Sequence, residues 1–434
     1  MDWRSWLRVL RLGIFAILFT IFLAPEWPVF GDEAVQLHAI VHPAEFDFLT
    51  WETDAFLVKG ETILSNSASL MTPELRKQLV LDFLNLVRET QQLRAEIDGL
   101  YVDPAVTNPD EAAQGLQETL VQKRAALLEL QPVAEAIVQN QVGTILAKQG
   151  FGVVGQAWPP VMMHMSPLPT LLVVSPRDRI ERTYGYSLRV DLSTVDHEAL
   201  ETAVTDKLNL SALVVPIGGL GTYPSMIMET GNLNWFVEVV AHEWSHHWMS
   251  FYPIGYNYGI DPRVRSINET VASTIDKEVA LLVVERFYPE FMLPPEPAAA
   301  ETQPVVPDPN TPPPFDFGAE MAATRMQVDQ LLADGKIKAA EMYMEARRRV
   351  FVANGYPIRK LNQAYFAFYG AYQAEPGGAP GSDPIGPLVR NVRANSVTLH
   401  SFMKQMASVG SFAELEMLAA RLKTEETVQT GSVP

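Results

Sequence analysis

Residues 235–248 read WFVEVVAHEWSHHW, and the centre of this run is the pattern His242-Glu243-Trp244-Ser245-His246. The apolar residues around the pattern predict a buried helix. On a helix, residues four apart lie about 40° from one another around the axis, so the two imidazoles share a face and can bind one metal ion. A site of this kind also needs a third protein ligand and an open position for water.

The composition limits what the protein can bind. The chain has 434 residues, of which 47% are apolar and 19% charged, as in globular proteins with a large core. Its formal charge of -18 argues against nucleic acid and anionic membrane surfaces as partners, because both require clustered lysine and arginine. Cysteine is absent, so histidine and carboxylate side chains are the strong zinc ligands that remain.

The first thirty residues differ from the rest of the chain. Arg4, Arg8 and Arg11 precede an uncharged apolar run at residues 12–24, a layout typical of a segment that directs a protein to a membrane. We expect an uncleaved signal-anchor, with a cleaved signal peptide as the alternative. This predicts a single-pass membrane protein with its N-terminus in the cytoplasm and its catalytic region extracytoplasmic, in a bacterial cell envelope.

The remaining patterns predict a mostly helical α+β protein. A small mixed or antiparallel sheet is expected to pack on the helix that carries the histidines, with a long helical hairpin before it and a helical subdomain after it. The predicted segments are 1–30 for the signal-anchor or signal peptide, 31–150 for the helical region with the hairpin, 151–292 for the α/β core, 293–316 for a proline-rich loop, 317–426 for the C-terminal helical subdomain and 427–434 for a tail.

Short β-rich runs come just before the histidine helix. Strands are predicted at residues 170–174, 187–192, 212–217 and 222–228, and the glycines at 218–221 are interpreted as a tight hairpin connection rather than a phosphate loop. The last run would be an edge strand along which a peptide could pair through main-chain hydrogen bonds. Its candidate substrate-binding residues are Thr222, Tyr223, Ser225 and, for a free amino terminus, Glu229.

A candidate third ligand lies on the next predicted helix. The segment Asn268-Glu269-Thr270-Val271-Ala272 places Glu269 among apolar residues. A carboxylate on the apolar side of a helix is unusual unless it is paired or bound to a metal. We therefore predict that His242, His246 and Glu269 hold one zinc ion. His247 is rotated about 100° from His246 and is not expected to be a ligand.

These two motifs together resemble a known group. HExxH followed by NExxA is similar to the ligand pattern of the gluzincin metallopeptidases, the thermolysin-like clan, in which the second helix packs antiparallel to the first. The resemblance implies zinc held by His242, His246 and Glu269, with Glu243 as the catalytic base. Many members carry an acid four residues after the ligand glutamate, where this chain has Ser273, so Asp276 or Glu238 is a possible substitute. More loosely, residues 361–365 resemble those of bacterial predicted aminopeptidases.

The expected activity is zinc-dependent hydrolysis of peptide bonds in a peptide or protein substrate at the membrane, by an aminopeptidase or an endopeptidase. Zinc would activate water, and Glu243 would take the proton. Tyr365 and Tyr369, four residues apart on one predicted helix, are candidate donors to the oxyanion, as are Tyr256, Tyr258 and His400. The alternative is a catalytically silent scaffold that binds cell-envelope proteins or peptides. The oligomeric state stays open.

A second histidine pair carries no predicted function. His38 and His42 are also four residues apart, but no ligand-like acid stands out beside them in the sequence. We interpret them as ordinary residues.

Overall fold

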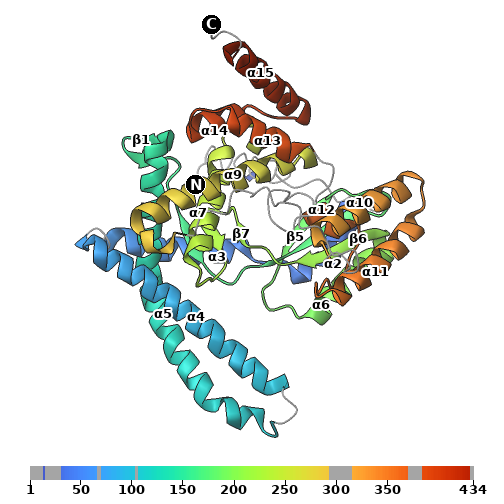
Figure 1. Ribbon diagram of the computed structural model, residues 1–434. Helices are drawn as coiled ribbons and strands as arrows, with labels where there is room; N and C mark the ends of the chain where they lie inside the picture. Colours follow the sequence, from blue (N-terminus) through green and yellow to red (C-terminus); the bar gives the residue numbers. More distant parts are fainter. Residues whose placement is uncertain are drawn as a thin grey trace, which may run out of the picture.

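The computed structural model describes residues 13–14, 31–65, 70–102, 106–292, 315–369 and 384–430. The prediction of a mostly helical α+β protein is confirmed. The described elements form two groups, one of which contains the HExxH region (Figure 1). One group consists of helices around α7 and α9, and the other is built on a three-stranded sheet covered by helices on both faces.

The helical hairpin precedes the core as predicted. It consists of α4 (Pro73–Val102) and α5 (Pro109–Leu146), which pack along each other and project from the rest of the protein (Figure 1). Asn108 caps α5, because its side chain accepts a hydrogen bond from the backbone of Glu111. Most buried residues of α5 lie in its second half, from Leu127 onward, where the helix enters the main core.

Helices α7 (Leu233–Met249) and α9 (Pro262–Phe287) form the centre of that core. Asn232 caps α7, because its side chain accepts a hydrogen bond from the backbone N–H of Trp235. The short helix α8 (Pro253–Tyr256) joins them. On the far side of α9 lie α13 (Ile385–Ala394), α14 (Leu399–Ala407) and α15 (Phe412–Thr430). Helix α7 is therefore buried between the hairpin, α9 and the small sheet that contains β8.

A small mixed sheet lies against α7. Its order is β3 (Met163–Met165), β8 (Ser225–Ile227) and β7 (Gly219–Leu220), with β8 parallel to β3 and antiparallel to β7. The prediction that residues 222–228 form an edge strand is wrong, because β8 has a neighbour on each side. Residues 222–224 instead form a bend, in which the Thr222 backbone N–H donates to the carbonyl of Leu220. The outer strand is β7, inside the glycine-rich run that was expected to be only a connection.

The second sheet is antiparallel, with β4 (Thr170–Pro176) between β5 (Tyr184–Leu188) and β6 (Leu210–Val215). Helices α2 (Glu33–Val41) and α6 (Thr194–Leu208) pack on one face of this sheet. Helix α12 (Gln363–Tyr369) packs on the other face, with α10 (Phe317–Ala333) and α11 (Ile337–Ala353) beside it. Strand β5 lies earlier than the predicted 187–192, because the chain turns at residues 190–191. Ser193 and Asp196 then form the capping box that begins α6.

The helices after residue 316 therefore pack in two places, α10–α12 on the sheet and α13–α15 on α9. The remaining elements are short or peripheral. They are η1 (His42–Ala44), α3 (Phe48–Ser65), η3 (Ala147–Phe151), β1 (Gly152–Val153), β2 (Gln156–Ala157) and η4 (Pro289–Phe291).

The expectation of a single-pass membrane protein is corrected. In the part of the chain that the structure describes, no helix combines the length and apolar character needed to cross a membrane. The apolar helix α7 has 17 residues and contains ionisable side chains, whereas a span needs about 20 predominantly apolar ones. The predicted signal-anchor at residues 1–30 lies outside the described residues apart from Gly13 and Ile14.

A buried charged cluster joins α3, α5 and β3. The Glu135 carboxylate is fully buried, pairs with the ammonium of Lys59 and lies 3.2 Å from Nδ1 of His164. It also accepts hydrogen bonds from the backbone of Met165 and from Gln131. Burial raises the pKa of Glu135, but the charges and hydrogen bonds of Lys59 and His164 outweigh that effect and bring the pKa to about 2.

Replacing Glu135 with glutamine should lower the free energy of unfolding by about 3–5 kcal/mol at pH 7, because Lys59 would remain buried without its partner. The contribution of Glu135 is present above its unfolded pKa of 4.5 and is lost as the pH falls toward 2. Chemical denaturation of wild type and variant across this range measures the difference.

Glu129→Gln, on the exposed side of the same helix, is the control and should change stability little. A Glu135→Gln protein as stable as wild type at pH 7, or a deficit that persists unchanged near pH 2, would contradict the role of this pair.

Candidate metal centre

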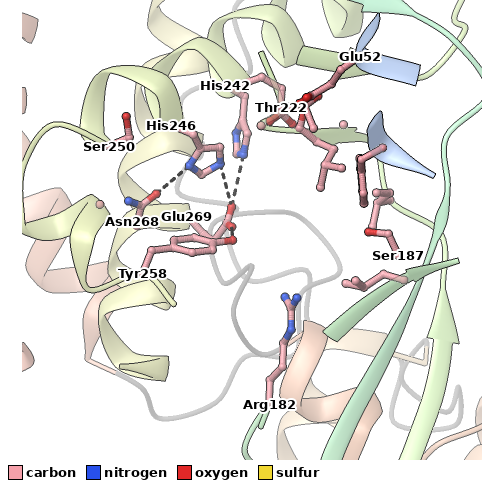
Figure 2. Close-up of a pocket in the computed structure, with 18 residues that line it drawn as sticks. Glu52, Arg182, Ser187, Thr222, His242, His246, Ser250, Tyr258, Asn268 and Glu269 are labelled. Carbon is pink, nitrogen blue, oxygen red and sulfur yellow. Dashed lines mark hydrogen bonds and ion pairs between the residues drawn. The ribbon is translucent and has the colours of Figure 1, made fainter. Parts of the chain in front are cut away.

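Three predicted ligands converge between α7 and α9 (Figure 2). The Nε2 atoms of His242 and His246 lie 3.4 Å and 3.5 Å from the same oxygen, Oε2 of Glu269. The two imidazole rings are 4.9 Å apart, as expected for residues one helical turn apart on one face. All three side chains thus direct a donor atom to one point, with ligand atoms within 4.8 Å of one another.

A second layer of side chains fixes both imidazoles. Nδ1 of His242 donates to Oδ2 of Asp276 at 2.8 Å, and Nδ1 of His246 donates to Oδ1 of Asn268 at the same distance. The Asn268 amide is oriented by its own N–H, which donates to the carbonyl of Ile254. Because both Nδ1 atoms are used in these hydrogen bonds, Nε2 is the nitrogen of each ring that can bind a metal ion. Asp276, one of the two proposed substitutes for an acid at Ser273, takes that orienting role.

The carboxylate of Glu269, the third predicted ligand, is also positioned by a hydrogen bond. The hydroxyl of Tyr258 donates to Oε1 of Glu269 at 2.6 Å, which leaves Oε2 facing the two histidines. Tyr258 was one of several tyrosines considered as donors to an oxyanion. Its hydrogen bond makes it a positioning residue for Glu269 instead.

Glu243 lies beside this group and is 5% exposed. A β-carbon built on Gly219 of β7 would lie 2.2 Å from Oε1 of Glu243, whereas one on Gly221 would be 3.5 Å from Oε2. A side chain at 219 would therefore displace the Glu243 carboxylate, because the strand passes directly against it. Burial raises the pKa of Glu243, and the two histidines oppose that shift.

The charges in the site favour a bound cation. Burial lowers the pKa of His242, but Asp276 and Glu269 outweigh it and raise the pKa well above its usual value. The pKa of His246 is raised as well, chiefly by Glu269 against burial. Burial raises the pKa of Glu269, yet the histidines bring it well below its usual range. Positive charge between these imidazoles and carboxylates is thus stabilised, and two histidines with one glutamate form a donor set of catalytic zinc sites.

The site opens into a cavity of about 500 Å³ between the two groups of elements. One wall is formed by α7, α9 and the segment 219–222, and the opposite wall by β4, β5 and the start of α3. Two further charged residues line this cavity, Glu52 of α3 and Arg182 just before β5 (Figure 2). Sequence reasoning had selected neither of them.

Of the four predicted substrate-binding residues, one lines the cavity and three do not. Thr222 lines the cavity, and its carbonyl accepts a hydrogen bond at 2.7 Å from Nε2 of His247. His247 therefore points away from the predicted ligands, and burial lowers its pKa to about 4. Tyr223 is not among the lining residues. Its ring packs edge-on against His247, and its hydroxyl donates to the carbonyl of Pro160.

Ser225 and Glu229 are also away from the cavity. Ser225 is buried in the central strand β8. The Glu229 carboxylate accepts hydrogen bonds at 2.7 Å and 2.9 Å from Arg124 of α5, so it connects the hairpin to the core. The structure thus gives Glu229 a partner within the protein rather than a place beside the metal ligands.

The structure also does not bring Tyr365 and Tyr369 to the cavity wall. Both lie on α12, 4.5 Å apart between ring centroids, and pack with residues on the face of the antiparallel sheet. Burial raises the pKa of each phenol. Of the other candidates, Tyr256 is exposed and donates to the carbonyl of Phe251, and His400 packs against Phe151.

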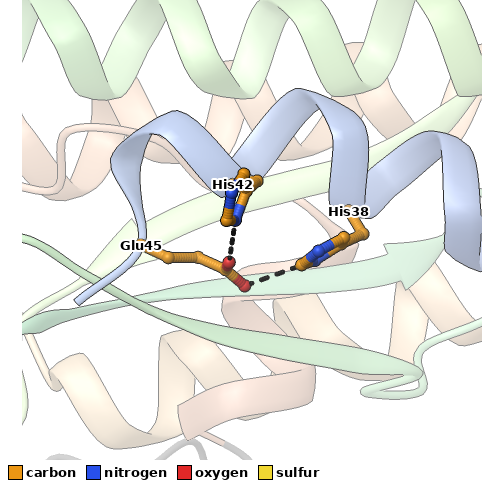
Figure 3. A group of neighbouring side chains, drawn as sticks. All are labelled: His38, His42 and Glu45. Carbon is orange, nitrogen blue, oxygen red and sulfur yellow. Dashed lines mark hydrogen bonds and ion pairs between the residues drawn. The ribbon is translucent and has the colours of Figure 1, made fainter. Parts of the chain in front are cut away.

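A second group of potential ligands lies on the surface (Figure 3). Glu45 lies 3.5 Å from Nδ1 of His38 and 3.0 Å from Nδ1 of His42. The histidine side chains are 55% and 72% exposed, in contrast to the buried centre between α7 and α9. Glu45 was missed from the sequence because it reaches back across the end of α2. These contacts suit an exposed ion pair, and no buried carboxylate like that of Glu243 lies beside the group among the described residues.

A scan against models of protein families, a search of curated proteins and a search of solved structures each find no match.

If Asp276 orients His242, replacing it with asparagine should weaken zinc affinity about 10- to 100-fold while leaving the fold intact. Competition with a chromogenic chelator measures the affinity. Glu278→Gln is the matched control, because Glu278 lies two residues away but pairs with Arg393 instead. Equal zinc affinity in the Asp276 and Glu278 variants would contradict the assignment.

Proposed function

We propose that the protein is a zinc-dependent hydrolase of peptide bonds, with His242, His246 and Glu269 as ligands and Glu243 as the general base. One observation carries this proposal: the three ligands direct their donor atoms to one point beside a buried carboxylate, at the wall of a cavity. The fixed Nδ1 atoms of both histidines add support, because they leave Nε2 available to the metal.

When bound, zinc would lower the pKa of a bound water molecule to about 7 and polarise the carbonyl of the substrate. Glu243 is placed to take one proton from the attacking water as the new carbon–oxygen bond forms. The same carboxyl then gives that proton to the nitrogen as the carbon–nitrogen bond breaks. Its burial against Gly219 keeps it in one orientation and shields it from bulk water.

The outer strand β7 supplies a surface for an extended peptide. Gly219 and Leu220 line the cavity and have β8 on only one side within the described sheet. A substrate strand added to this edge would run past Glu243, with its main chain fixed by hydrogen bonds. Strand β7 thus replaces residues 222–228 as the proposed pairing edge.

The aminopeptidase form of this activity needs a carboxylate for a free amino group. Glu229 does not line the cavity, but Glu52 does. Glu52 is therefore the residue that we assign to this role in the aminopeptidase form. Cleavage of N-acetylated peptides at the same rate as free ones would favour an endopeptidase instead.

Glu243→Gln should keep the zinc ion and the melting temperature of the wild type but lose about 10²- to 10⁴-fold in the rate of peptide hydrolysis. Release of fluorescence from a quenched-peptide library, together with metal analysis, measures both properties. His42→Ala, which removes a residue of the exposed group, should hydrolyse at the wild-type rate.

Undiminished hydrolysis in Glu243→Gln would refute the mechanism. Stoichiometric zinc without hydrolysis of any library peptide by the wild type would instead support the silent peptide-binding scaffold.

A further inference from the structure

The cavity contains one cation whose role the proposed reaction does not use. Arg182 is the only lysine or arginine among the described residues that line it, and it comes from the wall opposite the metal ligands. In Figure 2 its guanidinium is directed into the cavity toward the side that carries Glu269 and Tyr258. The other acidic residues and histidines that line the cavity are the predicted ligands His242, His246 and Glu269, together with Glu52 and Glu243.

Arg182 differs from its neighbours in having no partner within the described structure. Arg177 forms a two-point pair with Glu341, and Arg179 pairs with Asp178 and Glu181. For Arg182, the described residues offer no hydrogen bond or ion pair.

The backbone around Arg182 is fixed. The N–H of Thr183 donates to the carbonyl of Val174, and Gly185 pairs with Val173 in the sheet. A β-carbon built on Gly185 would lie 2.3 Å from Nη2 of Arg182. The guanidinium therefore lies across this glycine, and a residue with a side chain at 185 would displace it.

We propose that Arg182 binds a carboxylate of the peptide substrate and so makes the protein selective for peptides with a negative charge in this part of the cavity. This inference rests on the proposed function, because it assumes that a peptide occupies the cavity. The planar guanidinium offers paired N–H donors that match a carboxylate in two-point contact. The carboxylate has two possible sources, the C-terminus of a short peptide or an acidic side chain.

The test uses full-length, zinc-loaded Glu243→Gln protein, so that peptides bind without being cut. Calorimetry compares Ala-Ala-Phe-Ala with a free C-terminus, the same peptide with a C-terminal amide, and amidated Ala-Ala-Phe-Glu. We expect at least one of the two charged peptides to bind about 10- to 100-fold more tightly than the neutral amide, as for a hydrogen-bonded charge pair. The preferred charged peptide identifies the source of the carboxylate.

Adding Arg182→Met should abolish this preference and leave binding of the neutral amide unchanged. Arg179→Met, in the same connection but already paired with acids, is the matched control and should keep the preference. Gly185→Ala should also reduce the preference for charged peptides, because the added methyl group displaces the guanidinium without removing its charge.

The proposal is overturned if the charged and neutral peptides bind equally, if the preference survives Arg182→Met, or if that change weakens all three peptides equally. These outcomes are separate from failure of the proposed function. If charged and neutral peptides bind equally to the Glu243→Gln protein while the wild type shows Glu243-dependent hydrolysis, the role of Arg182 alone is refuted. If Arg182 binds the carboxylate but the wild type hydrolyses no peptide, the hydrolase proposal alone is refuted.

Discussion

The site depends on one contact, the Glu269 carboxylate lying between the imidazoles of His242 and His246. It requires α7 and α9 to pack at a fixed separation and in antiparallel directions, since His246 meets Asn268 while His242 meets Asp276. A buried carboxylate between two half-buried histidines is stable only if the charges are balanced, by protons or by a metal ion. Much of the main core surrounds these two helices and fixes that geometry.

The cavity lies between two parts of the chain that differ in secondary structure. The metal ligands and Glu243 come from rigid, buried helices, whereas Arg182 comes from the connection between two strands of the antiparallel sheet. Glycines allow the close approaches on both sides, Gly219 at Glu243 and Gly185 at Arg182. A peptide between these walls would meet a zinc-type donor set on one side and a positive charge on the other.

The central ligand geometry could be predicted from the sequence because helical spacing is local. His242 and His246 are one turn apart, and Asp276 is two turns from Glu269, so each pair shares a helix face once the helix is assumed. The strand order could not be predicted in this way. It depends on β3 pairing with β8 from far away in the chain, which made residues 222–228 look like an edge. The roles of Tyr258, Glu45 and Arg182 likewise follow from contacts or cavity positions that spacing does not encode.

The most direct test of the metal centre is anomalous diffraction at the zinc absorption edge from crystals of the full chain grown with one equivalent of zinc. The account predicts a single strong peak between α7 and α9, within about 2.0–2.2 Å of Nε2 of His242, Nε2 of His246 and a carboxylate oxygen of Glu269. A peak only at the exposed group of His38, His42 and Glu45, or no peak bound to these three ligands, would contradict it.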